Sequence, residues 1–283
     1  MAINDISLTS GMRNNLLSLQ NTTTLINRTQ TRLSTGKSVN TALDNPTNFF
    51  AAQTATARAT DLSNRKDGMS EAVQMVSAAN AGITGITSLI QSAQGVAQAA
   101  LATTSVTDRA SYATTFNTLM TQITELASDS GYRGTNFLNS QNQTVEFAPA
   151  TGGATLQIQG FDATSTGLGL STATNVGNTG STGWADATAG TANIQSSATQ
   201  LEGALNTLRS QSSTLSANLS VVTARQTFTD NMVSTLQTGA DNLTLADTNQ
   251  EGANLLMLQT RQSLGITSLS LASQAAQAVL KLF

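Results

Sequence analysis

Apolar residues recur every seven positions in two distant stretches of the chain. Two parallel rows keep this spacing between residues 69 and 97, and the pattern returns between residues 194 and 222. A heptad stripe sustained over four or more repeats is typical of long helices packed as a coiled coil. We therefore expect long rods in both halves of the chain, packed mainly against each other inside one molecule, as in a helical bundle.

Shorter amphipathic stripes lie elsewhere. A helix over about 107–128 is indicated by apolar steps of three and four residues. The candidate packing positions of the rods and of this helix are Met69, Val76, Ile83, Ile86, Ile90, Phe116, Leu119, Ile123, Leu126, Ile194, Leu201, Leu205, Leu208, Leu215, Leu219 and Val222.

The two ends of the chain carry thinner stripes, over residues 1–33 and about 244–282. Isolated helices gain most of their stability from packing, so intermolecular packing is the favoured account of these ends. We expect them to be largely disordered in the monomer and to fold on assembly. The candidate self-assembly positions are Met12, Leu16, Leu19, Ile26, Leu33, Leu255, Leu258, Ile266, Leu269, Ala272, Ala276, Val279 and Phe283.

Breaker residues divide the chain. Gly36 is a plausible stop for the first helix, and a linker follows over about 34–45. Asn45 and Pro46 are typical of an N-cap and a first helical position. The next proline is Pro149, so the sequence leaves room for a helix of about 55 residues, or ~80 Å.

The segment 131–192 differs from its surroundings, because it holds 11 of the 21 glycines and the only tryptophan. Alternating stretches at 144–147 and 155–159 predict a β-hairpin. A helix from 193 to about 238 follows, with a break near Gly239 before the last helix. The expected fold is mainly α, with long antiparallel coiled-coil helices, paired terminal helices and a small β-rich central segment. Its expected parts are 1–33 with 244–283, the linker 34–45, 46–130 with 193–238, and 131–192.

Composition narrows the function. Charged residues make up 10% of the chain against a usual ~25%, so copies repel one another weakly and dense self-packing is favoured. The formal net charge of -3 without a basic cluster argues against nucleic acid as a partner. No apolar run approaches the ~20 residues of a membrane span, and the N-terminus lacks the pattern of a secretory signal peptide. A polar secreted protein with no assembly role has the same composition.

Enzyme chemistry finds little support. The chain has no His and no Cys, which removes the usual catalytic triads, thiol nucleophiles and most zinc sites. Residues 34–37 fit S-x-x-K, but neither S-D-N nor K-T-G accompanies them. Residues 36–38 mimic the end of a P-loop, but Thr31 stands where that motif needs Gly. We expect no catalytic residues, no metal and no cofactor.

Three stretches carry a resemblance. Residues 32–46, RLSTGKSVNTALDNP, are one residue shorter than a signature that begins R-L-S-[ST]-G and ends D-[DN]-[AP]. Residues 131–138, GYRGTNFL, are similar to a turn motif, and residues 246–283 to a closing helix. Together these stretches resemble bacterial flagellins over about 1–140 and 193–283.

The resemblance implies a subunit that self-assembles into a helical homopolymer, the extracellular flagellar filament used in motility. It implies termini paired inside the filament, a central segment facing outward, and secretion by the flagellar type III apparatus without a cleaved signal. It also implies an export chaperone, a cap and hook-associated proteins as partners. From the charge and the hydropathy we expect neither nucleic acid nor membrane as a partner. A hook–filament junction protein, which has flagellin-like ends, is the first alternative. A secreted effector or enzyme and a helical signalling bundle are the others.

Overall fold

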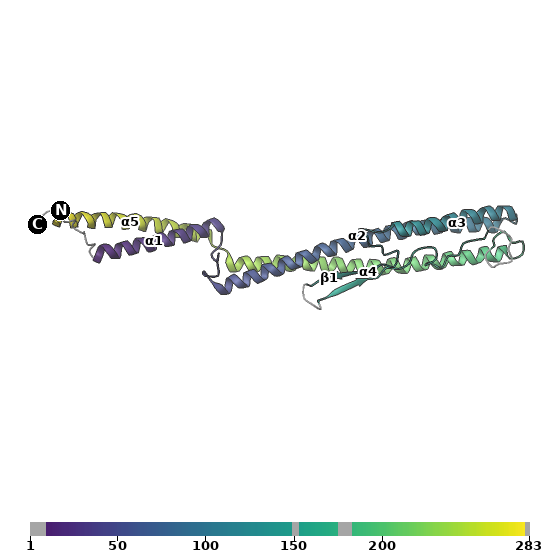
Figure 1. The fold of residues 1–283 in the computed structure, drawn as a ribbon, viewed down its shortest axis with the longest axis horizontal. Coiled ribbons are helices and arrows are strands. Elements are labelled where there is room, and N and C mark those ends of the chain that lie inside the picture. Colours follow the sequence, from purple (N-terminus) through teal and green to yellow (C-terminus); the bar gives the residue numbers. More distant parts are fainter. Residues whose placement is uncertain (1–9, 149–152, 175–182, 281–283) are drawn as a thin grey trace, which may run out of the picture. The chain divides into compact units, whose positions relative to one another are not determined.

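A computed structural model describes residues 10–148, 153–174 and 183–280. The described residues form five helices and one antiparallel pair of strands (Figure 1). The expected mainly α fold, with long antiparallel helices and a small β segment, is confirmed. The elements are α1 (Ser10–Thr35), α2 (Pro46–Ala102), α3 (Val106–Asp129), β1 (Gln143–Glu146), β2 (Thr155–Ile158), α4 (Gly190–Thr244) and α5 (Thr248–Leu280).

The chain divides into two compact units. One, the terminal unit, comprises Met1–Ala59 and Ser234–Phe283, and the other, the rod unit, comprises Thr60–Val233. The long helices α2 and α4 each contribute to both units. Each unit is described by itself below.

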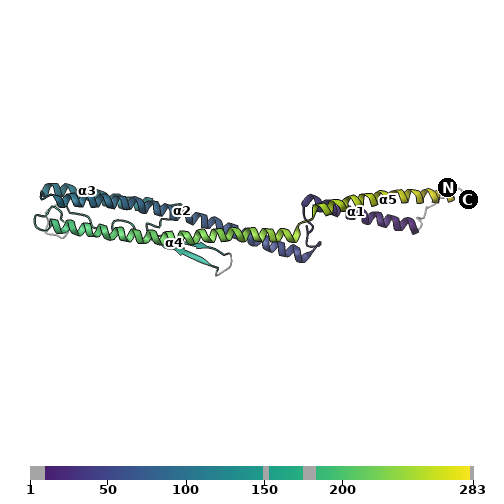
Figure 2. The same cartoon turned by 180° about the vertical axis from the view of Figure 1, so that it is seen from behind.

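The terminal unit is built on the pairing of α1 with α5, which lie side by side in both views (Figures 1 and 2). The helices are antiparallel, because Arg32 pairs with Glu251 near one end and Leu19, earlier in α1, approaches Gly265, later in α5. Few side chains in this pair are deeply buried, chiefly Ile26 and Leu258. Since packing supplies most helical stability, the pair has a small apolar core for its length.

The connector between α1 and α2 is fixed by main-chain hydrogen bonds to the segment between α4 and α5. Gly36 has a φ of +68°, which favours glycine and confirms it as the stop of α1. The Gly36 carbonyl accepts from the Ala246 amide at 2.9 Å, and the Ser38 amide donates to the Thr244 carbonyl at 2.7 Å. The α1–α2 connector and the segment between α4 and α5 are therefore joined by main-chain hydrogen bonds inside the terminal unit.

The start of α2 follows the sequence prediction. Pro46 is its first residue, and the Asn45 side chain accepts a hydrogen bond from the Asn48 amide at 3.1 Å. This arrangement satisfies one of the amides that a helix start leaves without a partner.

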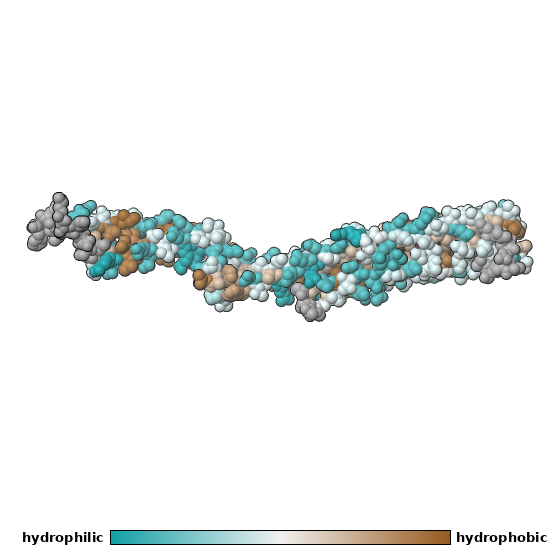
Figure 3. Space-filling model, viewed as in Figure 1, coloured by the Kyte–Doolittle hydropathy of each residue, from teal (hydrophilic) through white to brown (hydrophobic). Residues whose placement is uncertain are grey.

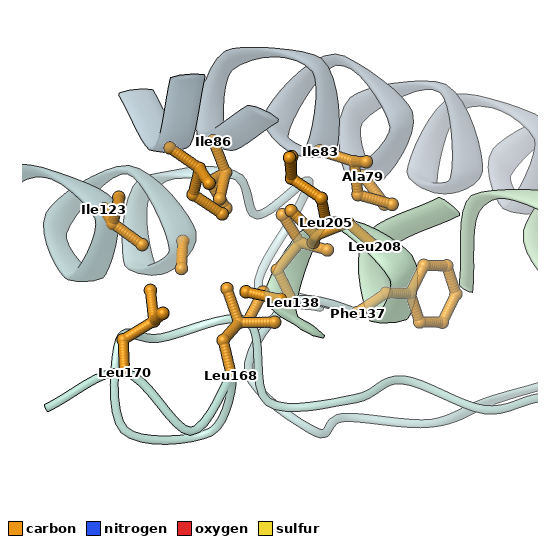
Figure 4. Close-up of a cluster of buried hydrophobic side chains, with 14 of the residues drawn as sticks. Ala79, Ile83, Ile86, Ile123, Phe137, Leu138, Leu168, Leu170, Leu205 and Leu208 are labelled. Atoms are coloured by element: carbon orange, nitrogen blue, oxygen red, sulfur yellow. The ribbon is translucent and has the colours of Figure 1, made fainter. Parts of the chain in front are cut away.

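The rod unit has a continuous apolar core formed by α2, α3, α4 and the loops that follow α3 (Figure 4). The close-up shows Ile83 of α2 beside Leu205 of α4, with Leu138 below them. Leu170, from the loops that follow α3, lies below Ile123 of α3. The helices α2 and α4 run antiparallel, since Asn80 contacts Ser212 and Ser70 contacts Gln226. The heptad rows thus meet within one chain.

Two glycines of α2 bring α3 and its C-terminal turn close. A Cβ at Gly82 would lie 2.6 Å from Leu138 Cδ1 and would also overlap the Ser130 side chain. A Cβ at Gly85 would lie 2.7 Å from Leu126 Cδ2. These positions accept no added atom unless a neighbour moves, which explains why helix-weakening glycines stand inside α2.

A buried arginine closes one end of the rod unit. Arg109 is 7% exposed, and its Nε donates to the carbonyls of Ala100 and Thr103 at 3.2 and 2.9 Å. Its Nη2 donates to Thr191 Oγ1 at 3.1 Å. The guanidinium therefore satisfies carbonyls at the C-terminal end of α2 and links α2, α3 and α4.

The predicted hairpin is confirmed. β1 and β2 pair antiparallel, with Gln143 opposite Ile158 and Glu146 opposite Thr155. Glu146 forms an ion pair with Arg65 of α2, and Arg225 of α4 lies over the ring of Phe147. The hairpin is thus attached to both long helices.

The loop 183–189 is held by buried side chains. Trp184 packs on Phe116 with ring centroids 4.7 Å apart, and its Nε1 donates to Ser197 at 3.2 Å. The Asp186 carboxylate accepts the amides of Ala189 and Thr188, which lowers its pKa. These contacts lead the chain into α4.

The predicted break near Gly239 is wrong, because α4 continues through Gly239 to Thr244. A glycine inside a helix costs about 1 kcal/mol relative to alanine. Packing just after the position outweighs this, since Ala240 and Thr244 are each 6% exposed. The N-terminal helix is described only from Ser10, so the expected residues 1–9, like residues 281–283, lie outside the described residues.

Helix α2 also carries a long apolar stretch, which the expectation of no membrane-length apolar run did not anticipate. Its most apolar 18-residue window has a mean hydropathy of 1.2, so length and composition alone would allow it to cross a membrane. A helix that contributes to a protein core passes the same test, and the Met69–Ala100 row of α2 is such a core face.

Candidate assembly surfaces

The expected self-assembly stripe mostly lies between α1 and α5. Ile26 and Leu258 are buried at 7% and 5% exposure, whereas Leu16 and Ile266 are exposed at 40% and 57%. The side chain of Val279 and all of Phe283 lie outside the described residues. The half-buried members are Met12, Leu19, Leu33, Leu255, Leu269, Ala272 and Ala276.

One ion pair fixes the register of these two helices. Arg32 Nη1 and Glu251 Oε1 are 2.9 Å apart, and the two side chains are only 24% and 11% exposed. Breaking a largely desolvated pair would leave one charge poorly solvated, so the register is specified at this position. Glu251 also lies in the first turn of α5, where a negative charge is favoured by the helix dipole.

A second apolar row lies on another side of α5. Met257, Leu264 and Leu271 are 60%, 63% and 61% exposed, and Leu256 beside them is 67% exposed. We call Met257, Leu264 and Leu271 the outward row. Its members repeat every seven residues, so they form a second heptad seam on a helix that already packs on α1. Figure 3 shows apolar surface gathered on the terminal helices.

The sequence analysis missed the outward row. The signal was present, because positions 257, 264 and 271 have the seven-residue spacing of a coiled-coil seam. A helix that is apolar on two faces gives no single stripe, and the period alone does not say which face meets α1.

The connector and the first turns of α2 add exposed apolar side chains. Leu43 is 96% exposed and Phe50 is 56% exposed. Between them, the Asp44 carboxylate accepts hydrogen bonds from the amides of Thr41 and Asn40. These bonds, first that from Thr41, hold the pKa of Asp44 below its ordinary value of 3.8.

The expected rod-packing residues all lie within or against the core of the rod unit. Leu119, Leu126 and Leu219 are half-buried against it. The buried members are Met69, Val76, Ile83, Ile86, Ile90, Phe116, Ile123, Ile194, Leu201, Leu205, Leu208, Leu215 and Val222. These faces are occupied inside one chain, so surfaces for other molecules must lie elsewhere on the rod.

Side chains that could carry chemistry do not converge. Within 10–148, 153–174 and 183–280, no group of three or more His, Cys, Asp or Glu residues could hold a metal ion. The described residues instead form long helical faces, a hydrogen-bonded connector between helices, and the exposed outward row of α5. Such a combination defines a structural protein of the self-associating helical class.

Comparison with known proteins identifies the family. Residues 3–143 match the model of the bacterial flagellin N-terminal helical region. The chain is 30% identical to flagellin FljN and 29% identical to flagellin FljO of Caulobacter vibrioides, each over 284 residues and 100% of both chains. Flagellin C of Rhizobium meliloti is 35% identical over 79 residues, which cover 28% of this chain and 25% of that protein.

The chain belongs to the bacterial flagellins. It is a structural subunit of the extracellular flagellar filament and not an enzyme. Agreement with flagellins over the full length decides between a filament subunit and the hook–filament junction alternative in favour of the filament subunit.

Proposed function

We propose that the chain joins the filament through the outward row of α5. The supporting observation is that Met257, Leu264 and Leu271 are each about three-fifths exposed, at heptad spacing, beside a face that is already packed. Fully burying a Leu or Met side chain contributes about 1.5–3 kcal/mol, so burying three such side chains from this degree of exposure contributes roughly 3–5 kcal/mol per copy. That contribution recurs at every subunit of the polymer.

The inner stripe has a supporting role in this proposal. Residues such as Ile26, Leu258 and Leu269 hold α1 against α5, and the pair then presents the outward row as one surface. The Arg32–Glu251 ion pair sets the register of that surface. Along the chain, 1–33 with 244–283 forms the inner part of the filament, 34–45 the linker, 46–130 with 193–238 the rod, and 131–192 the outward-facing segment.

The further partners belong to the same proposal. An exposed apolar row of this size promotes unspecific association before assembly. An export chaperone that covers it until the chain enters the type III apparatus would prevent this. The cap and the hook-associated proteins would then receive the same surface at the two ends of the filament. Membership of the flagellins supports these partners.

A pair of neighbouring substitutions tests the proposal. Leu264→Asp places a charge in the outward row, whereas Ser263→Asp places the same charge about 100° around the helix, also on an exposed position. Purified monomers of both variants are polymerised with salt, sedimented and viewed by negative-stain electron microscopy. Circular dichroism verifies that both fold alike.

We expect Leu264→Asp to remain in the supernatant and Ser263→Asp to form filaments like the parent chain. Filaments of ordinary yield from Leu264→Asp would refute the role of the outward row. A failure of both variants to polymerise would also refute it, because the effect would then not depend on the apolar side chain.

A further inference from the structure

The rod unit carries an exposed patch on α4 that the core does not use. Val221 and Phe228 are 45% and 54% exposed, and Arg225 lies between them on the same face of the helix. The guanidinium of Arg225 lies 5.2 Å from the centroid of the Phe147 ring. No carboxylate of the described residues pairs with it. We call Val221, Arg225 and Phe228 the α4 patch.

A groove of complementary character lies between α2 and α3. Its volume is ≈ 420 Å³, and the half-buried side chains of Leu89 and Leu126 line it together with Gly85. Glu125 and Asp129 stand at its edge. Glu125 accepts a hydrogen bond from Gln122 at 2.6 Å, and neither acid forms an ion pair with a described residue. The groove therefore combines an apolar floor with two uncompensated negative charges.

The patch and the groove face opposite sides of the rod unit. On α4, Phe228 is two residues from Gln226 and from Asp230, whose side chains reach α2, so it points about 200° away from them. On α2, Gly85 is two residues from Ile83, which packs toward α4 (Figure 4), and so also lies about 200° around the helix. One chain cannot bring its own patch and groove together.

Two different, complementary surfaces on opposite sides of a subunit produce a heterologous contact, which continues into an open helical polymer. We propose that the α4 patch of one copy occupies the α2–α3 groove of a neighbouring copy in the filament. Phe228 and Val221 cover Leu89 and Leu126, and Arg225 approaches Glu125 and Asp129. The opposite charges favour this occupant over an unrelated apolar surface. This lateral contact is separate from the outward row of α5.

The register within one chain fixes the offset between neighbours. The contacts of Gln226 with Ser70 and of Asp230 with Lys66 place Arg225 level with about residue 71 of α2. The groove is centred near Leu89, about 18 residues further along α2, which is roughly 27 Å at 1.5 Å per residue. Parallel neighbours joined by this contact are staggered by that distance along the rod.

Cysteine cross-linking tests both the contact and the stagger, because the chain has no cysteine of its own. Ser92→Cys in the groove is combined with Ala224→Cys beside the α4 patch, and both positions are exposed. The control combines Ser92→Cys with Thr207→Cys, which is exposed on α4 about 26 Å from Ala224. Filaments and monomers of both double variants are oxidised and separated under denaturing conditions.

We expect a ladder of covalent multimers from filaments of the Ser92→Cys/Ala224→Cys chain alone. Filaments that give no ladder overturn the proposal, as does an equal ladder from the Thr207→Cys control or from monomers. Failure of the outward-row proposal shows as filaments from Leu264→Asp, whereas failure of the lateral-contact proposal shows as filaments that give no specific ladder. The two proposals therefore fail in different ways.

A charge exchange gives a second readout. Arg225→Glu places a third negative charge against the groove and is expected to raise the critical concentration for polymerisation roughly tenfold. Arg209→Glu, an exposed reversal outside the patch, is the control. Adding Glu125→Arg and Asp129→Arg to Arg225→Glu is expected to restore most of the loss. If the critical concentration is not restored, the proposal is overturned. The defect of Arg225→Glu would then come from its lost contact with Phe147, which charges in the groove do not affect.

Discussion

Two glycines of α2 provide a matched test of the packing in the rod unit. Replacing glycine by alanine inside a helix stabilises it by up to about 1 kcal/mol. At Gly95 nothing lies within 4 Å of the added Cβ, so Gly95→Ala is expected to gain this amount. At Gly82 the same atom would overlap Ser130 and approach Leu138 Cδ1 to 2.6 Å.

Neither neighbour of Gly82 can move away cheaply. The Ser130 hydroxyl donates to the Leu126 carbonyl at 2.6 Å, and Leu138 is fully buried. Overpacking a core by a methyl group costs about 1–3 kcal/mol, so Gly82→Ala is expected to lose about 1 kcal/mol after the helical gain is subtracted. The two variants should differ by about 2 kcal/mol, or roughly 4–8 °C in melting temperature for a unit of this size.

Thermal unfolding of the monomer measures this difference. The fluorescence of Trp184 reports on the rod unit, because it is the only tryptophan and is fully buried there. Circular dichroism follows the helices in the same samples. A Gly82→Ala chain that melts as high as Gly95→Ala would refute the close approach of α2 to the turn after α3.

The remaining predictions concern the buried cation, the connector and the chain ends. Arg109→Lys is expected to destabilise the rod unit by about 2 kcal/mol in urea unfolding, because lysine lacks the planar fork that reaches three acceptors; an unchanged midpoint would contradict this. The lowered pKa of Asp44 implies a contribution to stability that is present above pH 3.8 and lost as pH falls through the lower folded value. The protection factor of the Thr41 amide, which is its exchange rate relative to an unfolded chain at the same pH, should therefore fall at acid pH in the parent chain. In Asp44→Asn it should already be low at neutral pH. Limited proteolysis should trim both termini of the monomer but not of the filament, and equal protection would sink the expectation that the ends fold on assembly.

The long helices could be predicted because their pattern is local and repeated. The spacing of Met69, Val76 and Ile83 places one face of α2 in a core whatever the partner is, and Pro46 marks where the helix begins. The hairpin could also be predicted from the sequence, because alternating apolar residues and turn residues are short-range signals. These features depend on neighbouring residues more than on distant packing.

The misassigned features depend on tertiary contacts. Gly239 stays helical because the residues around it pack, which a propensity scale does not include. The outward row of α5 has the same seven-residue period as the stripe that packs on α1. Only the position of α1 in the structure shows which of the two faces is covered. Finding the α2–α3 groove required the packing of α3 beside Gly85, for which the sequence has no local signal.

The central claim is that the outward row of α5 is covered by other copies in the filament. Oxidation of Met257 by hydrogen peroxide, quantified by peptide mass spectrometry, tests it directly because Met257 is 60% exposed in the single chain. Met69, which is fully buried, serves as the internal reference in both states. The account predicts rapid oxidation of Met257 in monomers and strong protection in filaments, whereas equal oxidation in both states would contradict it.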